Sequence, residues 1–284
     1  MRANDTMTFA LHLLMIVDDP AIAAFVASNG VDRLFVDLEV MGKAERQGHL
    51  DTVQSVQSSR TVTRVREAAP DAHLLVRINP MHDGSRLEID DVIARGADSV
   101  MLPMFHDAQT LARFLDLLDG RAEALPLVET VGALNALPEI AATLPVTQVH
   151  IGLNDLHLER GDRMMFAPLA DGSLETACAA LRAQTVRFGI GGLARAGEGH
   201  LPPELLLGEH VRLGSSAAIL SRSFHRRAAS LQALQTDMDF TGEVARLQDI
   251  YAEFQTRDGA YLEANRATFA AGVMELAANA RAAT

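Results

Sequence analysis

Two carboxylates that lie one strand–helix unit apart suggest the chemistry of this sequence. Glu129 lies at the end of the apolar run 124–130, and Asp155 directly follows the apolar run 148–154. If the two runs are neighbouring parallel strands, the two carboxylates lie close together and repel each other unless a cation lies between them. Mg²⁺ or Mn²⁺, which prefer oxygen ligands, would be suitable cations. The alternative is that the two acids only cap the helices that follow.

An arginine inside an apolar run is the second candidate. Arg77 interrupts the stretch LLVRINP, where a lone buried charge would be costly unless it reaches a cavity or a partner. At the rim of a metal site, its guanidinium would hold an oxyanion. The alternative is a structural ion pair with Asp37 or Glu39.

The elements that must position these residues follow a regular alternation. Apolar runs, typical of buried parallel strands, are expected at 11–17, 33–39, 73–79, 99–105, 124–130, 148–154, 187–193 and 210–216. Amphipathic helices are expected between them at 20–29, 53–69, 86–96, 107–119, 131–143, 173–185 and 202–209. Eight such units predict an α/β fold, a (β/α)₈ TIM barrel. A doubly wound open sheet is less suitable, because no glycine-rich turn follows the first strand.

The remaining chain predicts a helical extension. We expect a barrel domain over residues 1–228 and C-terminal helices over 229–284. Two helical stripes in this extension are apolar and need a partner surface: Val244, Leu247, Tyr251, Phe254 and Leu262, Phe269, Val273, Leu276. A homo-oligomer is the favoured prediction, and a tail folded back on its own barrel is the alternative.

Composition limits the partners. The net charge of −12 repels nucleic acids and anionic membrane surfaces, so neither is expected as a partner. The single cysteine, Cys178, excludes an internal disulfide framework. The apolar run FALHLLMIV is too short to span a bilayer and leads into no cleavage site, so a cytoplasmic location is expected.

Five stretches also resemble a known family. FVDLE, LLVRINP, GADSVMLPMF, LPLVETVGALNALPEIA and VHIGLNDLHLERG are similar, in order and spacing, to the HpcH/HpaI aldolase and citrate lyase beta-subunit family, over roughly residues 10–225. The resemblance implies a phosphoenolpyruvate/pyruvate-type TIM barrel with a divalent metal. It also implies making or breaking of carbon–carbon bonds next to an oxo-acid or an acyl-CoA ester.

The resemblance gives the candidate residues their roles. It implies that Glu129 and Asp155 bind Mg²⁺ or Mn²⁺ and that Arg77 faces the enolate oxygen. The remaining substrate contacts are assigned to the backbone amides of Gly152, Leu153 and Asn154 and to Glu39.

One position differs from the aldolases. They carry a histidine just after the acid of the second strand, where this chain has Val40. The polar loop that follows carries Lys43, Glu45, Arg46 and His49, which could all reach substrate, and the alternative is a solvated loop without a role. His49 is the first candidate for the catalytic proton, and Lys43, Glu45 or a metal-bound water are the alternatives.

The sequence thus predicts a metal-dependent carbon–carbon lyase that acts on a small oxo-acid through a pyruvate-like enolate. An acyl-CoA lyase of the citrate lyase type and a non-catalytic barrel subunit that binds an oxo-acid are the alternatives.

Overall fold

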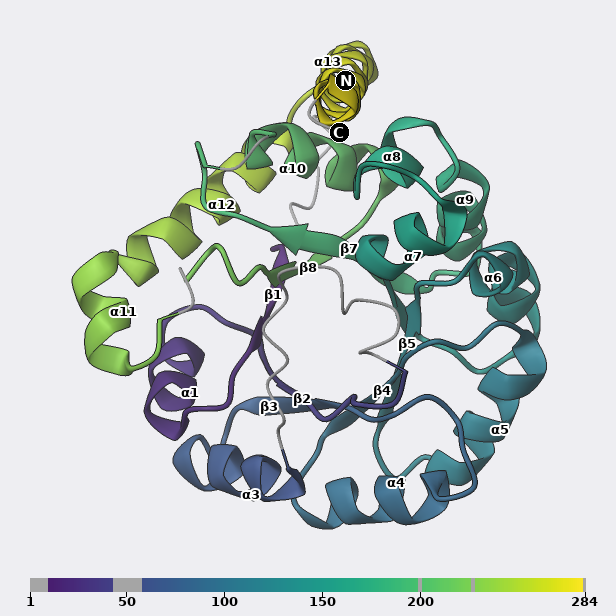
Figure 1. Ribbon diagram of the computed structural model, residues 1–284, viewed down its shortest axis with the longest axis vertical. Helices are drawn as coiled ribbons and strands as arrows, with labels where there is room; N and C mark the ends of the chain where they lie inside the picture. The colour runs from purple at the N-terminus through teal and green to yellow at the C-terminus, as the bar shows by residue number, and fades with distance from the viewer. Residues whose placement is uncertain (1–9, 43–57, 199–200, 226–227, 283–284) are drawn as a thin grey trace, which may run out of the picture.

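Eight parallel strands close into a barrel in the computed structural model, which describes residues 10–42, 58–198, 201–225 and 228–282 (Figure 1). The strands pair in chain order, and β8 closes the ring by pairing with β1. They are β1 (His12–Ile16), β2 (Arg33–Asp37), β3 (His73–Arg77), β4 (Ser99–Leu102), β5 (Glu123–Val128), β6 (Gln148–Ile151), β7 (Arg187–Leu193) and β8 (Ala217–Leu220). The predicted (β/α)₈ barrel is confirmed.

Helices cover the outside of this barrel (Figure 1). Those between the strands are α1 (Pro20–Ala27), α3 (Ser59–Ala68), α4 (Ser85–Ala94), α5 (Ala108–Leu118), α6 (Val131–Thr143), α7 (Leu153–Arg160), α8 (Ala167–Ala170), α9 (Glu175–Ala183) and α10 (Pro203–Leu213). After β8 come α11 (Leu231–Asp237), α12 (Phe240–Gln255) and α13 (Gly259–Ala282).

Local sequence signals explain where several helices begin. The Asp19 carboxylate accepts hydrogen bonds from the amides of Ala21 and Ile22, at 2.8 and 2.9 Å, so α1 begins at Pro20, directly after this cap. Asp107 caps α5 in the same way through the amide of Thr110, at 2.7 Å. These caps fix the residue at which each helix begins, where the chain turns back to pack on the outside of the sheet.

The barrel interior is built in layers. Six apolar side chains fill its middle, contributed by five strands: Leu14, Phe35, Leu75, Met101, Leu125 and Leu127. Successive side chains of a strand point to opposite faces, so residues two positions away from these also point inward. The inward positions toward the strand starts are polar and include Arg33 and Gln148. The inward positions toward the strand ends include three charged residues, Asp37, Arg77 and Glu129.

The eighth strand lies later than the sequence predicted. Residues 203–213 form α10, which therefore includes most of the predicted strand 210–216, and β8 begins at Ala217. Gly214 ends α10 in the left-handed region at φ 84°, a conformation that glycine adopts without a steric penalty. The prediction was wrong because β8 is four residues long and starts with two alanines, which carry no strand signal.

The C-terminal helices pack on the chain's own barrel. Val244, Leu247 and Tyr251 of α12 are buried, and the Tyr251 hydroxyl donates to the Ser215 carbonyl at 2.9 Å. In α13, Phe269 and Val273 are buried, and this helix lies beside α10 and α8 (Figure 1). The apolar faces from which a homo-oligomer was predicted are thus largely covered in cis. The oligomer stays a prediction, without that support. No helix in the described ranges is long and apolar enough to cross a bilayer.

Candidate active site

The inward positions at the strand ends bring two predicted site residues, Arg77 and Glu129, to one end of the barrel together with Asp37, the possible ion-pair partner of Arg77. Asp37 and Arg77 end neighbouring strands β2 and β3 and stand opposite each other in the pairing register. Glu129 follows β5 directly, two positions beyond the inward-facing Leu127. Functional groups of such barrels lie at this carboxyl-terminal end of the strands.

Arg77 is held by two carboxylates. Its Nε and Nη2 donate to the two carboxylate oxygens of Asp37, at 2.9 and 2.8 Å, and Nη2 lies 3.4 Å from Glu39 Oε2. The guanidinium also lies 5.6 Å from the centre of the Phe35 ring. Burial opposes its charge, but Asp37 and Glu39 together raise the pKa of Arg77. The ion pair that the sequence left as an alternative is therefore present, and it fixes the guanidinium in one orientation.

Glu129 is a buried carboxyl in acidic surroundings. Its side chain is 3 % exposed, and Oε1 accepts a hydrogen bond from the amide of Met104 at 3.1 Å. Burial raises the pKa of Glu129 to about 8; the charge of Arg77 opposes this, while Asp155 and Glu39 raise it further. A cation bound here would offset the repulsion between these carboxylates.

Met104 is a residue that the sequence did not single out. Its backbone has φ of 52°, in the left-handed region that residues other than glycine seldom adopt. In this conformation its amide donates to Glu129, at the mouth of the barrel. Strained backbone of this kind often occurs at functional sites, and a methionine between a proline and a phenylalanine gives no sequence signal for it.

Asp155 reaches the same region from a helix, which corrects the prediction that it ends a strand. Strand β6 stops at Ile151, Gly152 caps α7, and Asp155 lies in the first turn of that helix with 8 % exposure. A Cβ atom at Gly152 would lie 3.1 Å from Glu129 Oε2 and 3.0 Å from Glu129 Cβ. The glycine therefore allows β6 to pass close to Glu129 on its way to Asp155.

The backbone amides that were predicted to hold a substrate carboxylate divide into two groups. The amide of Gly152 donates to the Val128 carbonyl at 2.9 Å, so it already has a partner in the sheet. Leu153 and Asn154 are the first two residues of α7, whose amides have no carbonyl one turn earlier to bond. Of the three predicted amides, these two remain for a ligand.

A cavity of about 500 Å³ joins most of these groups. Arg77, Glu129, Gly152, Leu153, Asn154 and Asp155 all line it, together with residues of β7, β8 and the loop after β8. Glu39 contacts Arg77 and is absent from the described residues that line this cavity, so its predicted contact with substrate has no direct support.

The two carboxylates are typical of a magnesium site that water and substrate complete, and not of a site in which protein side chains supply every ligand. Within residues 10–42, 58–198, 201–225 and 228–282, no group of three or more histidine, cysteine or acidic side chains is arranged to hold a metal. Mg²⁺ is commonly held by one or two carboxylates and completes its shell with water and substrate oxygens. Glu129 and Asp155, on one cavity wall, fit that pattern.

The loop that carries the predicted base starts beside this site. Asn79 Oδ1 accepts hydrogen bonds from the amides of Val40 and Met41, both at 2.9 Å, and Asn79 Nδ2 donates to Glu88 Oε1 at 2.8 Å. These hydrogen bonds fix the backbone of the two residues that follow Glu39. His49, the predicted base, lies in residues 43–57, outside the described residues.

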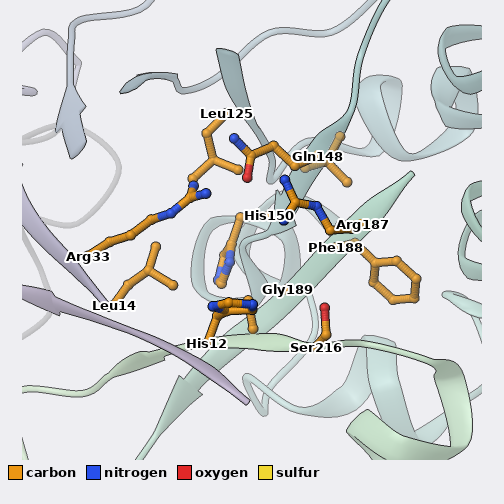
Figure 2. A pocket seen from close by; sticks show the side chains of 12 residues that line it. His12, Leu14, Arg33, Leu125, Gln148, His150, Arg187, Phe188, Gly189 and Ser216 are labelled. Carbon is orange, nitrogen blue, oxygen red and sulfur yellow. The ribbon is translucent and has the colours of Figure 1, made fainter. Parts of the chain in front are cut away.

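The opposite end of the barrel has a different character (Figure 2). A small cavity of about 30 Å³ there is lined by apolar residues together with polar residues from the strand starts, among them His12, Arg33, Gln148 and Arg187. Glu123 Oε2 lies 3.3 Å from Arg33 Nη2 and accepts from Gln148 Nε2 at 2.9 Å. This cavity accommodates little more than water, and an ion-pair network at the amino-terminal face of such a barrel serves stability.

His150 forms the floor between the two cavities, because it lines both. Its Nε2 lies 3.1 Å from the Gly191 carbonyl, and burial lowers the pKa of His150 to about 4. The ring is therefore neutral near pH 7. A Cβ at Gly189 would lie 2.4 Å from His150 Nδ1, so the ring occupies space that only glycine leaves open.

Comparison with known proteins identifies the barrel. No protein-family model and no curated protein sequence matches the chain. A solved HpcH/HpaI aldolase/citrate lyase family protein from Burkholderia cenocepacia J2315 is similar in structure, with a TM-score of 0.61 at 18 % identity, over 80 % of this chain and 94 % of that one. The HpcH/HpaI aldolase from Desulfitobacterium hafniense DCB-2 has a TM-score of 0.59 at 18 % identity, over 82 % and 95 %.

A third structure carries a different activity on the same architecture. The citrate synthase SbnG has a TM-score of 0.57 at 16 % identity, over 80 % of this chain and 93 % of that one. At these identities the likeness concerns the fold, and the chemistry must be argued from the site. The chain shares the barrel fold of solved HpcH/HpaI aldolase and citrate synthase structures.

Proposed function

We propose that the protein is a divalent-metal-dependent carbon–carbon lyase that cleaves an oxo-acid through a pyruvate-like enolate. The observation that carries this proposal is the carboxyl-terminal cavity in which Arg77, Glu129 and Asp155 meet. Names of the structurally similar proteins, aldolase and citrate synthase, denote chemistry in which carbon–carbon bonds form or break. These names support carbon–carbon bond chemistry as the reaction class, and they do not identify the substrate.

The residues have separate tasks in this proposal. Glu129 and Asp155 would hold Mg²⁺ or Mn²⁺, which when bound acts as a Lewis acid toward the oxo group and carboxylate of the substrate. The free amides at the start of α7, those of Leu153 and Asn154, are positioned to donate to the substrate carboxylate.

Arg77 stabilises the charge that develops when the carbon–carbon bond breaks. Asp37 binds its Nε and Nη2, and the contact with Glu39 also involves Nη2. None of these three contacts uses Nη1. A guanidinium that is fixed before the reaction can donate to an enolate oxygen without reorganisation at the moment of bond cleavage. The surrounding carboxylates thus serve the chemistry by fixing the orientation of the arginine.

Proton exchange of pyruvate tests the proposal without knowledge of the full substrate. An enzyme that forms the enolate exchanges the methyl protons of pyruvate with solvent, which proton NMR in D₂O follows directly. We expect exchange that needs Mg²⁺ or Mn²⁺, stops with a chelator and is lost in Glu129→Gln, but persists in Arg113→Gln, a change at an exposed position on α5.

The same measurement separates the alternative functions. A non-catalytic barrel would bind pyruvate with metal but leave its methyl protons in place. An acyl-CoA lyase of the citrate lyase type would exchange the α-protons of an acyl-CoA ester and leave pyruvate unchanged. Either result would contradict the oxo-acid lyase.

A further inference from the structure

The connection that leaves β2 is held by a side chain that follows β3. At the end of the two strands, the amide of Leu38 donates to the backbone carbonyl of Arg77 at 2.9 Å. Two residues further along both segments, the amide of Val40 donates instead to the side-chain Oδ1 of Asn79, at 2.9 Å. The amide of Met41 donates to the same oxygen, also at 2.9 Å. Asn79 thus supplies the acceptor that keeps the chain joined to β3 after β2 has ended.

Two further hydrogen bonds fix the orientation of the Asn79 side chain. Its Nδ2 donates to Glu88 Oε1 at 2.8 Å, and its backbone amide donates to the same oxygen at 3.1 Å. Glu88 lies in the first turn of α4, and its Oε2 lies 3.1 Å from His82 Nε2. Because an ionised carboxylate only accepts hydrogen bonds, the Asn79 nitrogen must face Glu88. Its oxygen is thereby directed to the two amides that follow Glu39.

Glu39 lies between the two points at which the chain is joined to β3. The amides of Leu38, before it, and of Val40, after it, are both bound there. The Glu39 side chain is 2 % exposed, and its Oε2 lies 3.4 Å from Nη2 of Arg77. Beyond the effect of burial, the negative charge of Glu39 also contributes to the raised pKa of Glu129. A shift of the backbone at this point would therefore move a charge that acts on two residues of the candidate site.

We propose that Asn79 is a positioning residue for the lyase reaction. By holding the backbone after Glu39, its Oδ1 keeps the Glu39 carboxylate against Arg77. This inference rests on the proposed function, in which Arg77 stabilises the enolate. Asn79 acts through Glu39, since it is absent from the described residues that line the cavity. A displacement of about 1 Å in a catalytic group can cost about a hundredfold in rate, so a hydrogen bond outside the cavity can control turnover.

Two substitutions of Asn79 separate positioning from stability. Asn79→Ala removes the acceptor of the two amides, so we expect the kcat of metal-dependent pyruvate proton exchange to fall about tenfold or more. The KM for pyruvate should change little, because the proposed metal ligands and the amides at the start of α7 are untouched. Asn79→Asp keeps the acceptor but places a second carboxylate beside Glu88. It should lower the Tm at least as much as alanine does, and yet retain most of the wild-type kcat.

Asp239→Ala is the matched control for the loss of a side-chain acceptor. Asp239 caps α12 by accepting a hydrogen bond from the amide of Gly242 at 3.0 Å. This helix contributes no residue to the described lining of the cavity. The substitution should lower the Tm, as the loss of a helix cap does, and leave kcat unchanged.

Glu39→Gln tests the route by which Asn79 acts. Glutamine keeps the shape of the side chain and removes the charge that faces Arg77. If Asn79 acts through Glu39, Asn79→Ala should add little further loss of kcat in the Glu39→Gln background, because coupled residues are not additive. A full tenfold further loss in that background would overturn the proposed route.

The failures are distinguishable. If wild type exchanges pyruvate protons in a metal-dependent way and Asn79→Ala does so at the same rate, the positioning role is refuted while the proposed function stands. The same holds if Asn79→Asp loses as much kcat as Asn79→Ala. If wild type shows no metal-dependent exchange, the proposed function and the inference fail together.

Discussion

The exchange of Arg77 for lysine separates a catalytic role from a structural one. Lysine keeps the charge but has a single nitrogen, so it cannot reproduce the two bonds of 2.9 and 2.8 Å to Asp37 together with the 3.4 Å contact to Glu39. Loss of one charge-assisted hydrogen bond costs about 1.5–3 kcal/mol in free energy of unfolding. Because domains are typically stable by about 5–15 kcal/mol, the variant should still fold.

Turnover should fall by much more than this loss of stability explains. Removal of one donor to a developing oxyanion costs about a hundred- to thousandfold in rate. A variant that remains folded loses almost no active protein, so a hundredfold drop in pyruvate proton exchange must come from the site itself. Urea unfolding and the NMR exchange assay, on the same Arg77→Lys preparation, measure the two effects independently.

Asp37→Asn is the matched control. It weakens the same ion pair but keeps the guanidinium and its contact with Glu39, so we expect a similar loss of stability with a smaller loss of turnover. The reasoning is refuted if Arg77→Lys is destabilised and yet exchanges pyruvate protons at the wild-type rate. In that case the ion pair would be the whole role of Arg77.

Three further predictions concern the metal, a buried histidine and the loop. Glu129→Gln and Asp155→Asn should each weaken Mn²⁺ binding about tenfold or more in calorimetry, and wild-type affinity in both would refute the metal site. Burial lowers the pKa of His210 from 6.5 to about 3, so the unfolded chain takes up a proton first and stability falls as pH drops below 6.5. That linkage amounts to about 2 kcal/mol at pH 5. Buried His150 loses stability over the same pH range in both proteins, so urea titrations at pH 7.5 and 5 should show a loss in His210→Asn that is about 2 kcal/mol smaller than in wild type. His49→Ala should alter one limb of the pH–rate profile if His49 moves the proton, and an unchanged profile would leave Lys43, Glu45 or a metal-bound water as candidates.

The sequence predicted the barrel and the inward-facing site residues for one physical reason. A parallel barrel buries both faces of its strands, which produces apolar runs that only a few polar residues interrupt. Arg77 and Glu129 were conspicuous against that background, and the two-residue period of a strand placed both inside the barrel with Asp37. A residue that violates the local pattern at a strand end is therefore informative.

Other features had no local signal. Strand β8 escaped detection because the helical face of α10 also carries alternating apolar residues and β8 itself is short. The positive φ of Met104 is imposed by its surroundings and not by its side chain. Asn79 binds the amides of Val40 and Met41, which lie 39 and 38 positions before it in the chain. A contact over that distance cannot be predicted from a single stretch of sequence.

The three inward layers show how one repeating pattern yields two different ends. On β5, residues 123, 125, 127 and 129 alternate inward as glutamate, leucine, leucine and glutamate. Glu123 lies half-exposed in an ion-pair network with Arg33, whereas burial and its acidic neighbours raise the pKa of Glu129 to about 8. The same residue type thus supports stability at one end and favours cation binding at the other. What differs is the set of charges that neighbouring strands bring alongside: Arg33 balances Glu123, while Asp155 and Glu39 add to the negative charge around Glu129, and Arg77 offsets only part of it.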